Sequence, residues 1–166
     1  YPYTKESERE RAAAIAATLA AHEGLSEKLD ANQLRDALNG YYDICYDLLR
    51  QAFPQGNYYT DWIADELFIV VFVEAGENEK ELVNKALGFA EALIRGKETF
   101  RARYGLPAAI DVGISNGSAL IGMMGPEGFR KATALGEIPG RARRLQSCGK
   151  LLRARFGDRL DDLCIE

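Results

Sequence analysis

The sequence contains few residues of the kinds that build metal clusters, nucleic-acid surfaces or membrane spans. Its only histidine, His22, is interpreted as a surface or loop residue rather than a catalytic base. The three cysteines, Cys45, Cys148 and Cys164, share no metal-ligand spacing, which favours free thiols in a reduced, cytoplasmic setting. The net charge of −4 argues against a nucleic-acid-binding surface, where Lys and Arg dominate. No apolar stretch approaches the length of a membrane span and no signal peptide is visible, so we expect no membrane contact by this segment.

The composition that remains is that of a globular domain. The chain has 166 residues, of which 47% are hydrophobic and 28% charged, and this predicts one domain large enough for a buried core. Because the sequence starts at Tyr1 without a methionine, we expect it to be a domain of a longer multidomain protein.

Hydrophobic periodicity predicts helices and strands in alternation. Apolar residues in a 4-3-4-3 spacing mark one helical face over residues 31–51, with Asp30 as the N-cap. Residues 57–64 and 67–73 are rich in aromatic and β-branched residues and predict two strands joined tightly around Asp65 and Glu66. Residues 78–103 are again helical in pattern, and the sequence YGLP that follows predicts the end of this helix.

The C-terminal third predicts a hairpin and a further helix. Residues 108–117 alternate and end in an Asn-Gly turn signal, so residues 118–125 are expected to be the returning strand. A polar loop over 126–140 and a basic helix over about 140–154 follow. The order helix, two strands, helix, two strands, helix predicts an α+β fold, with helices covering one face of a mostly antiparallel sheet.

The alanine-rich segment 8–25 is ambiguous on local evidence. Alanine is the best helix former, so propensity predicts a helix. An alanine-rich run can also serve as a central strand where tertiary packing demands it, because propensity is a weak prior.

Three segments resemble the class III nucleotidyl cyclases, the adenylate and guanylate cyclase catalytic domains. GISNGSALIGMMGPEGFRKATALGEIPGRARRLQ (113–146) resembles their G-I-x-x-G-x-x-x-G-x-x-G … G-D-x-x-N-x-A-x-R-L segment. LDANQLRDALNGYYDICYDLLRQA (29–52) resembles the helix that leads to the metal-carrying hairpin, and DWIADELFIVVF (61–72) resembles that hairpin's K-x-x-G-D motif. The sequence ADELF also resembles the G-G-D-E-F signature of diguanylate cyclases, but the glycine pattern after Asp111 favours class III.

The resemblance implies a fold and a pairing. It covers the chain from about 12 to 150 and implies a ferredoxin-like βαββαβ nucleotidyl cyclase fold, with a domain core over about 12–154 of the single domain 1–166. The segment Ala12–Leu19 then has to be the central strand, because no other segment is left for that place. Cyclases of this family share each site between two subunits, so the partner is expected to be a second copy or another cyclase-type domain, paired head to tail.

The chemistry implied by the resemblance needs metal ions and a set of polar groups. The ribose 3′-hydroxyl of ATP or GTP attacks the α-phosphate and pyrophosphate leaves. Two Mg²⁺ or Mn²⁺ ions on two carboxylates at neighbouring strand ends neutralise the phosphates. An arginine stabilises the transferring phosphoryl group, and an asparagine positions the ribose.

When the family's positions are matched to this sequence one by one, only one of the two metal-binding aspartates is present. Asp65 falls on the second metal aspartate. Thr18 stands where the first strand of the family carries the other aspartate, in the pattern F-x-D-I-x-G-F-T. A neutral threonine cannot hold a divalent cation as a hard anionic ligand does.

The nucleotide-binding positions are also mixed. The two purine-reading positions fall on Asp61, where adenylate cyclases carry Lys and guanylate cyclases carry Glu, and on Thr133. The ribose asparagine falls on Gly140, which has no side chain. Arg144 matches the transition-state arginine, with Arg141 and Arg143 beside it as alternatives.

Three functions follow from these positions. The first is a catalytically degenerate cyclase domain that works as a regulatory or dimerisation module. The second is an active cyclase with a reorganised metal site that uses Asp65 and Glu66 together on one metal. The third is a diguanylate-cyclase-like domain.

Overall fold

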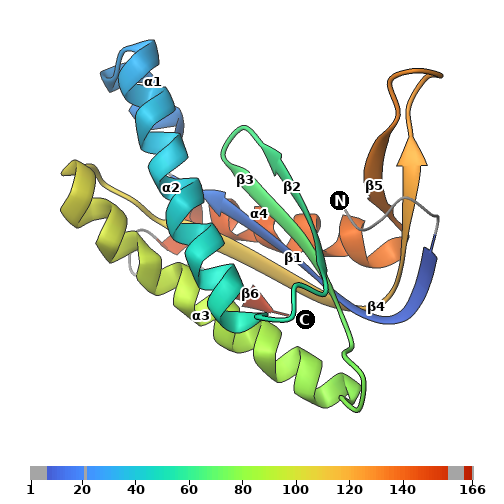
Figure 1. Cartoon of the computed structure of the whole chain (residues 1–166). Coiled ribbons are helices and arrows are strands. Elements are labelled where there is room, and N and C mark those ends of the chain that lie inside the picture. The colour runs from blue at the N-terminus through green and yellow to red at the C-terminus, as the bar shows by residue number, and fades with distance from the viewer. Residues whose placement is uncertain (1–6, 21, 157–162, 166) are drawn as a thin grey trace.

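The computed structural model describes residues 7–20, 22–156 and 163–165. The helices and strands follow one another along the chain as shown in Figure 1. In order they are β1 (Ser7–Leu19), α1 (His22–Lys28), α2 (Ala31–Ala52), β2 (Tyr58–Ile63), β3 (Glu66–Phe72), α3 (Glu79–Tyr104), β4 (Ile110–Met124), β5 (Lys131–Leu135), α4 (Glu137–Phe156) and β6 (Leu163–Ile165).

The strands form one mostly antiparallel sheet in the order β2-β3-β1-β4-β5, and the short β6 runs parallel to the first half of β4. β1, α2, β2, β3, α3 and β4 make up the predicted βαββαβ core, so the predicted α+β fold class is confirmed. The prediction that all helices cover one face is wrong. Helices α2 and α3 cover one face, whereas α4 packs on the other (Figure 1).

The alanine-rich segment is the central strand β1, as the resemblance required. It pairs with β3 on one side and β4 on the other, and Ala12 to Ala17 are at most 1% exposed. Odd-numbered residues of this run face α2 and α3, and even-numbered residues face α4. Helical propensity fails to predict this segment because the strand is covered on both faces. Burying its small apolar side chains between two layers stabilises the strand by more than the intrinsic helical preference of alanine opposes it. Within the described residues, only His22–Lys28 of the run 8–25 is helical.

The two long helices lie close to the predicted ranges, and capping groups mark their ends. Asp30 is the N-cap of α2, and its carboxylate accepts hydrogen bonds from the backbone N–H groups of Asn32 and Gln33 at 2.9 Å each. Asn78 caps α3 in the same capping-box arrangement, with Glu81 as the reciprocal partner. Gly105 then ends α3 in the left-handed conformation, with φ of 64°.

The predicted hairpin around Asn116 and Gly117 is wrong, because β4 runs unbroken from Ile110 to Met124. The long β1 pairs with both halves of β4, from Leu19 opposite Ile110 to Ser7 opposite Ile121, so a turn would break this ladder. The glycine serves a β-bulge instead. Gly117 has φ of 145° and lies opposite Ala12, where the register shifts.

The strand that returns along β4 is β5, which lies within the segment predicted as a polar loop. Lys131 pairs with Met124 and Leu135 pairs with Leu120. The basic helix α4 therefore starts directly after β5, three residues earlier than predicted, at Glu137. In Figure 1 the β4–β5 hairpin extends away from the body of the sheet.

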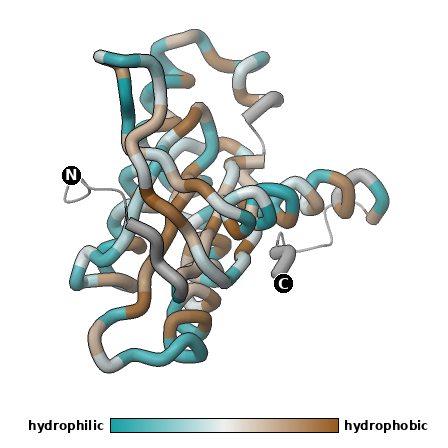
Figure 2. Tube along the Cα trace, turned by 90° about the vertical axis from the view of Figure 1, so that its right-hand side faces the viewer, coloured by the Kyte–Doolittle hydropathy of each residue, from teal (hydrophilic) through white to brown (hydrophobic). Residues whose placement is uncertain are grey.

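Two hydrophobic clusters, one on each side of the sheet, hold these layers together. The larger cluster lies between the sheet and helices α2 and α3, and the smaller one lies beneath α4 and β5. Figure 2 shows hydrophobic residues running through the strands, with hydrophilic residues in the outer turns. Among the described residues, no helix is long and apolar enough to cross a membrane.

The hairpin of β2 and β3 carries the one strained residue of the described backbone. Ile63 pairs with Glu66, which leaves Ala64 and Asp65 as a two-residue turn. Ala64 has φ of 52°, a left-handed value that an L-residue adopts at a cost, and no other described non-glycine residue has a positive φ. The cyclase hairpin motif K-x-x-G-D has glycine at this position.

Replacing Ala64 should therefore test the turn. We expect Ala64→Gly to raise the free energy of unfolding by about 0.5–1 kcal/mol, because relief of the left-handed strain exceeds the entropy that glycine adds to the unfolded chain. The matched control is Gly105→Ala, which has open space around it but φ of 64° and should lower stability by about 1 kcal/mol. Urea denaturation followed by circular dichroism measures both, and equal signs for the two changes would contradict the strained turn.

Candidate functional site

Thr18 lies in a row of three cross-strand neighbours at the end of the sheet. In the ladder it is paired with Glu66 of β3 on one side and with Asp111 of β4 on the other. Directly opposed residues of antiparallel strands project from the same face, with Cβ atoms about 4.5–5.5 Å apart. The neutral threonine is therefore flanked by two acidic residues on the face that α4 covers.

Glu66 is bound by a cation from α4. The Nε of Arg143 donates a hydrogen bond to Oε1 of Glu66 at 2.8 Å, and the two side chains are 38% and 21% exposed. The same guanidinium lies over the ring of Phe68, 4.1 Å from its centroid. Arg143 thus joins α4 to the start of β3 through an ion pair and a cation–π contact.

Asp65 is the second residue of the turn between β2 and β3 and directly precedes Glu66. Its backbone carbonyl accepts a hydrogen bond from the N–H of Leu19 at 3.3 Å, which ties the turn to the end of β1. Burial raises the pKa of Tyr42 on α2, and the negative charge of Asp65 raises it further. Burial also raises the pKa of Tyr41, to which Asp65 adds a smaller contribution. The carboxylate therefore lies within electrostatic reach of α2.

Asp111 completes the row beneath α4, where it is only 2% exposed. A Cβ atom added to Gly149 would lie 2.4 Å from Oδ1 of Asp111, and one added to Gly113 would lie 2.2 Å from the backbone oxygen of Ala142. These two glycines let the backbone of α4 lie directly on β4. The close approach is what brings Arg143 to the strand ends.

The residues at the strand ends do not fit a pair of metal ions. In the described ranges, no group of three or more His, Cys, Asp or Glu side chains could hold a metal. Thr18 carries no charge, and Glu66 already has Arg143 as its cation. A metal ion held by Asp65 and Glu66 together would have to compete with Arg143 for Glu66.

An ion pair joins β2 and β5, the strands that carry the two predicted purine-reading positions. Asp61 of β2 forms an ion pair with Lys131 of β5 at 3.3 Å, and Lys131 is two residues from Thr133 on the same strand. The hydroxyl of Tyr59 donates to the backbone oxygen of Ala132 at 3.0 Å. Thr133 itself is half-buried, and its hydroxyl donates to the carbonyl of Lys131 at 3.4 Å. The outermost strands β2 and β5 therefore meet across the face that also carries α4.

The ribose and phosphate positions lie one turn apart on α4. Arg144 is exposed, and its guanidinium makes no hydrogen bond or ion pair with the described residues. Gly140 is half-buried, and an added Cβ would meet only Nη1 of Arg144, at an ordinary 3.4 Å. Because residues four apart share a helix face, positions 140 and 144 are neighbours.

Two contacts that define the site were missed by reasoning from sequence. Arg143 was considered only as a substitute for Arg144, and nothing local indicates its contact with a residue 77 positions away. Lys131 had a usable signal. It lies two residues before Thr133 in an alternating strand, so it shares a face with that position.

Solved structures with the same fold come from nucleotide cyclases. The adenylyl cyclase CyaB from P. aeruginosa superposes with a TM-score of 0.76 at 20% identity, over 87% of this chain and 74% of that one. The fold is that of a cyclase catalytic domain. No family model and no curated protein matches the sequence.

Two guanylyl cyclase structures are similar to nearly the same extent. The catalytic core of a rhodopsin-guanylyl cyclase with converted specificity, in complex with ATPαS, gives a TM-score of 0.72 at 19% identity, over 87% of this chain and 75% of that one. The non-canonical dimeric guanylyl cyclase domain of the RhoGC fusion protein from Blastocladiella emersonii gives 0.71 at 18%, over 87% and 77%. The cyclase-type fold thus accounts for most of each chain.

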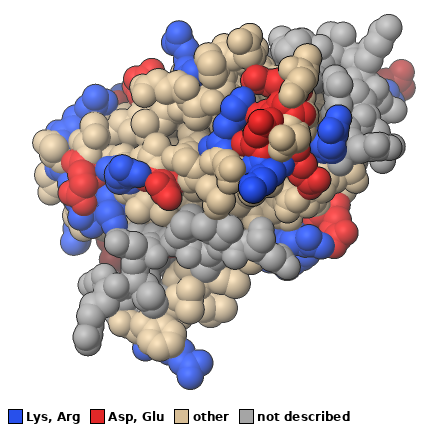
Figure 3. Space-filling model, turned by 90° about the horizontal axis from the view of Figure 1, so that it is seen from below, with Lys and Arg blue, Asp and Glu red and all other residues tan. Residues whose placement is uncertain are grey.

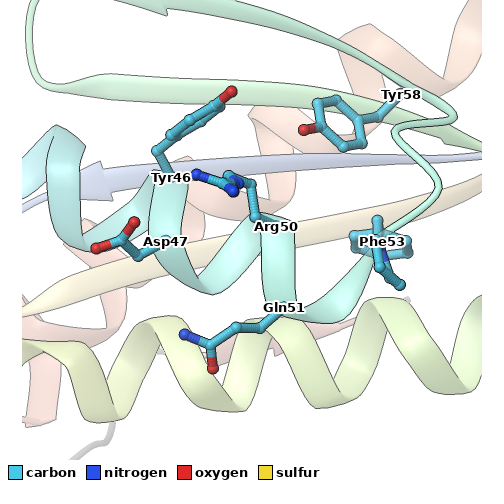
Figure 4. A pocket seen from close by; sticks show the side chains of 7 residues that line it. Tyr46, Asp47, Arg50, Gln51, Phe53 and Tyr58 are labelled. Atoms are coloured by element: carbon cyan, nitrogen blue, oxygen red, sulfur yellow. The ribbon is translucent and has the colours of Figure 1, made fainter.

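An open cleft of about 490 Å³ lies apart from these positions, at the end of α2. In Figure 4 the hydroxyls of Tyr46 and Tyr58 point toward one another near Arg50, whose guanidinium is 6.0 Å from the ring centroid of Tyr46. None of the predicted site residues lines this cleft.

Basic and acidic side chains are interspersed on the described part of the face shown in Figure 3, so neither sign of charge dominates there. Pairs along α3, such as Glu91 with Arg95 and Glu98 with Arg101, have this mixed character.

The glycines of the α4 interface allow a matched test of which ones the fold requires. We expect Gly140→Asn to change the free energy of unfolding by no more than about 0.5 kcal/mol, because the side chain has room and asparagine is a slightly better helix residue than glycine. Gly113→Ala should lower it by about 3 kcal/mol, because the new Cβ meets the backbone of α4. Urea denaturation of both variants is the measurement, and a large loss for Gly140→Asn would mean that packing forbids a side chain there.

Proposed function

We propose that the chain is a cyclase-type domain without appreciable cyclase activity of its own, which works as a regulatory or dimerisation module. The observation that carries the proposal is the row at the strand ends, where neutral Thr18, which the sequence resemblance aligns with a metal aspartate, lies beside Glu66. A carboxylate is needed at that position to hold a divalent cation against the phosphates. Glu66 cannot replace it while it is paired with Arg143.

The ribose position supports the same proposal. Gly140 offers no hydrogen-bonding side chain, although the structure has room for one. Loss of a single charge-stabilising group from such a site typically costs about 2.7–4 kcal/mol, or roughly 10²–10³ in rate. With two groups missing, the remaining rate should be close to background even if the losses are not additive.

A second candidate is a half-site in a heterodimer. The exposed guanidinium of Arg144 has no partner among the described residues, so it is free to reach a nucleotide held by another chain. A partner with both metal aspartates would bind Mg²⁺ or Mn²⁺, and Arg144 of this chain would contact the nucleotide there. Such a site would still lack the asparagine that positions the ribose.

The decisive measurement is turnover by the purified domain. We expect no cyclic AMP or cyclic GMP above the enzyme-free background when the domain is incubated with Mn²⁺ and either ATP or GTP. A known active cyclase, assayed in parallel, confirms that the assay detects the product. Turnover at ordinary enzymatic rates, about 1 s⁻¹ or above, would show that the active site lies on other residues. Cyclic di-GMP in the GTP reactions would favour the diguanylate-cyclase-like alternative.

The proposed pairing of two domains has a candidate surface on the β4–β5 hairpin. Met123, Met124 and Phe129 are 38%, 47% and 84% exposed, and they lie on or beside the hairpin that extends from the body in Figure 1. Large apolar side chains exposed together are common at protein–protein contacts. One of the similar structures is a non-canonical dimeric guanylyl cyclase domain, which supports pairing of two domains but does not identify the surface.

Charged substitutions should therefore separate the pair. We expect the unmodified domain to run as a dimer in size-exclusion chromatography with light scattering, and Met124→Asp combined with Phe129→Asp to run as a monomer. The matched control is Leu151→Asp on α4, which is 71% exposed but lies away from the hairpin, and it should leave the mass unchanged. A monomeric unmodified domain, or a dimer that survives both changes, would contradict pairing through this surface.

A further inference from the structure

We propose that the guanidinium of Arg143 is a built-in cation that takes the place of a metal ion at the strand ends and keeps an external cation out. The inference deepens the proposed function and rests on it, because it gives the physical reason why this site does not recruit metal. It concerns the same face of the sheet, where Glu66, Thr18 and Asp111 form a row beneath α4.

The contacts of Arg143 are those of a fixed cation rather than a solvated surface charge. Its Nε donates to Oε1 of Glu66 at 2.8 Å, and its guanidinium stacks at 4.1 Å over Phe68. The Glu66 side chain is 21% exposed and that of Arg143 38%, so the carboxylate is the better shielded partner of the pair. A planar guanidinium stays charged at all ordinary pH values, and it can donate hydrogen bonds from its edge while its face stacks on an aromatic ring. Both are engaged here.

The row contains two acidic residues, Glu66 and Asp111, and Arg143 is paired with the first of them. With threonine at position 18, Arg143 supplies one positive charge to the one carboxylate that it contacts, Glu66. An aspartate at position 18 would be flanked by Glu66 and by the buried Asp111, and three acidic groups would then share one face. Such a cluster needs additional positive charge, which a divalent cation supplies when no arginine occupies the place.

The placement of Arg143 depends on the close contact between α4 and β4. Gly113 and Gly149 leave no space for a side chain between the helix and the strand. Ala142, the neighbour of Arg143, is fully buried against the sheet. The helix therefore cannot move away to admit a metal ion and its ligands without breaking this packing, and the cation beside Glu66 is fixed with the fold.

The test restores the missing carboxylate with and without the arginine. The variants are Thr18→Asp, Arg143→Met and the two combined, and bound Mn²⁺ is measured by the loss of the free-ion signal in electron paramagnetic resonance. We expect no binding by the unmodified domain and at most weak binding by Thr18→Asp. The combined variant should bind at least about tenfold more tightly than Thr18→Asp, because a like charge has been removed from beside the ion. Its melting temperature should rise with added Mn²⁺.

Further variants make the comparison specific. Glu66→Gln added to the combined variant should abolish Mn²⁺ binding if the ion occupies the place of the guanidinium. Arg143→Lys with Thr18→Asp keeps the positive charge and should bind as weakly as Thr18→Asp alone. Arg143→Met alone should lower the melting temperature more than Arg95→Met, which breaks a fully solvated pair with Glu91. If the methionine variant does not fold, Arg143→Gln removes the charge but keeps a hydrogen-bond donor.

Equal Mn²⁺ affinity for Thr18→Asp with and without Arg143 would overturn the inference. Mn²⁺ binding by the unmodified domain that Glu66→Gln abolishes would overturn it as well. Neither result depends on turnover. If the domain formed cyclic nucleotide while these binding results came out as expected, the proposed function would be wrong and the role of Arg143 would stand.

Discussion

The arrangement of the whole molecule depends on one strand that is buried on both faces. Because β1 presents alanines to both sides, α2 and α3 can lie close to one face and α4 to the other. Larger side chains on this strand would separate the layers, and the ion pair of Arg143 with Glu66 would then be out of reach. The same small residues that mislead propensity therefore set the distance between the helices and the sheet.

The second constraint follows from the first, because α4 has to meet β4 backbone to backbone. Gly113 and Gly149 make that contact possible, and the helix then projects Arg143 and Arg144 in different directions. Arg143 turns toward Phe68 and Glu66, whereas Arg144 remains in solvent. Adjacent residues on a helix point about 100° apart, so one arginine belongs to the structure of this chain while the other is left for a ligand or a partner.

Sequence alone predicted the elements whose signals are local and failed where a distant partner decides. The capping residues Asp30 and Asn78 and the glycine after α3 mark helix ends through neighbouring groups, and the predicted helices agree with α2 and α3 to within one residue or two. The Asn-Gly turn was wrong because β1 supplies a ladder long enough to carry β4 through positions 116 and 117. The strand β1 was identified only through the resemblance. The contact of Arg143 with Glu66 could not be read at all, since it joins two elements 77 residues apart.

The same distinction applies to how the site is interpreted. Taken singly, Thr18 indicates the loss of a metal ligand, and an arginine on a basic helix indicates a solvated charge. The structure places Glu66 between them, paired with Arg143 and opposite Thr18 in the ladder. A threonine in place of a carboxylate and an arginine beside Glu66 change the charge of this face in the same direction, and under the proposal for Arg143 the two together exchange a bound ion for a covalently attached one. A cation attached to the chain cannot be removed by a chelator or by dilution, and a face neutralised in this way remains ordered without nucleotide or metal. That property suits a domain whose proposed role is to hold a shape for a partner rather than to turn over a substrate.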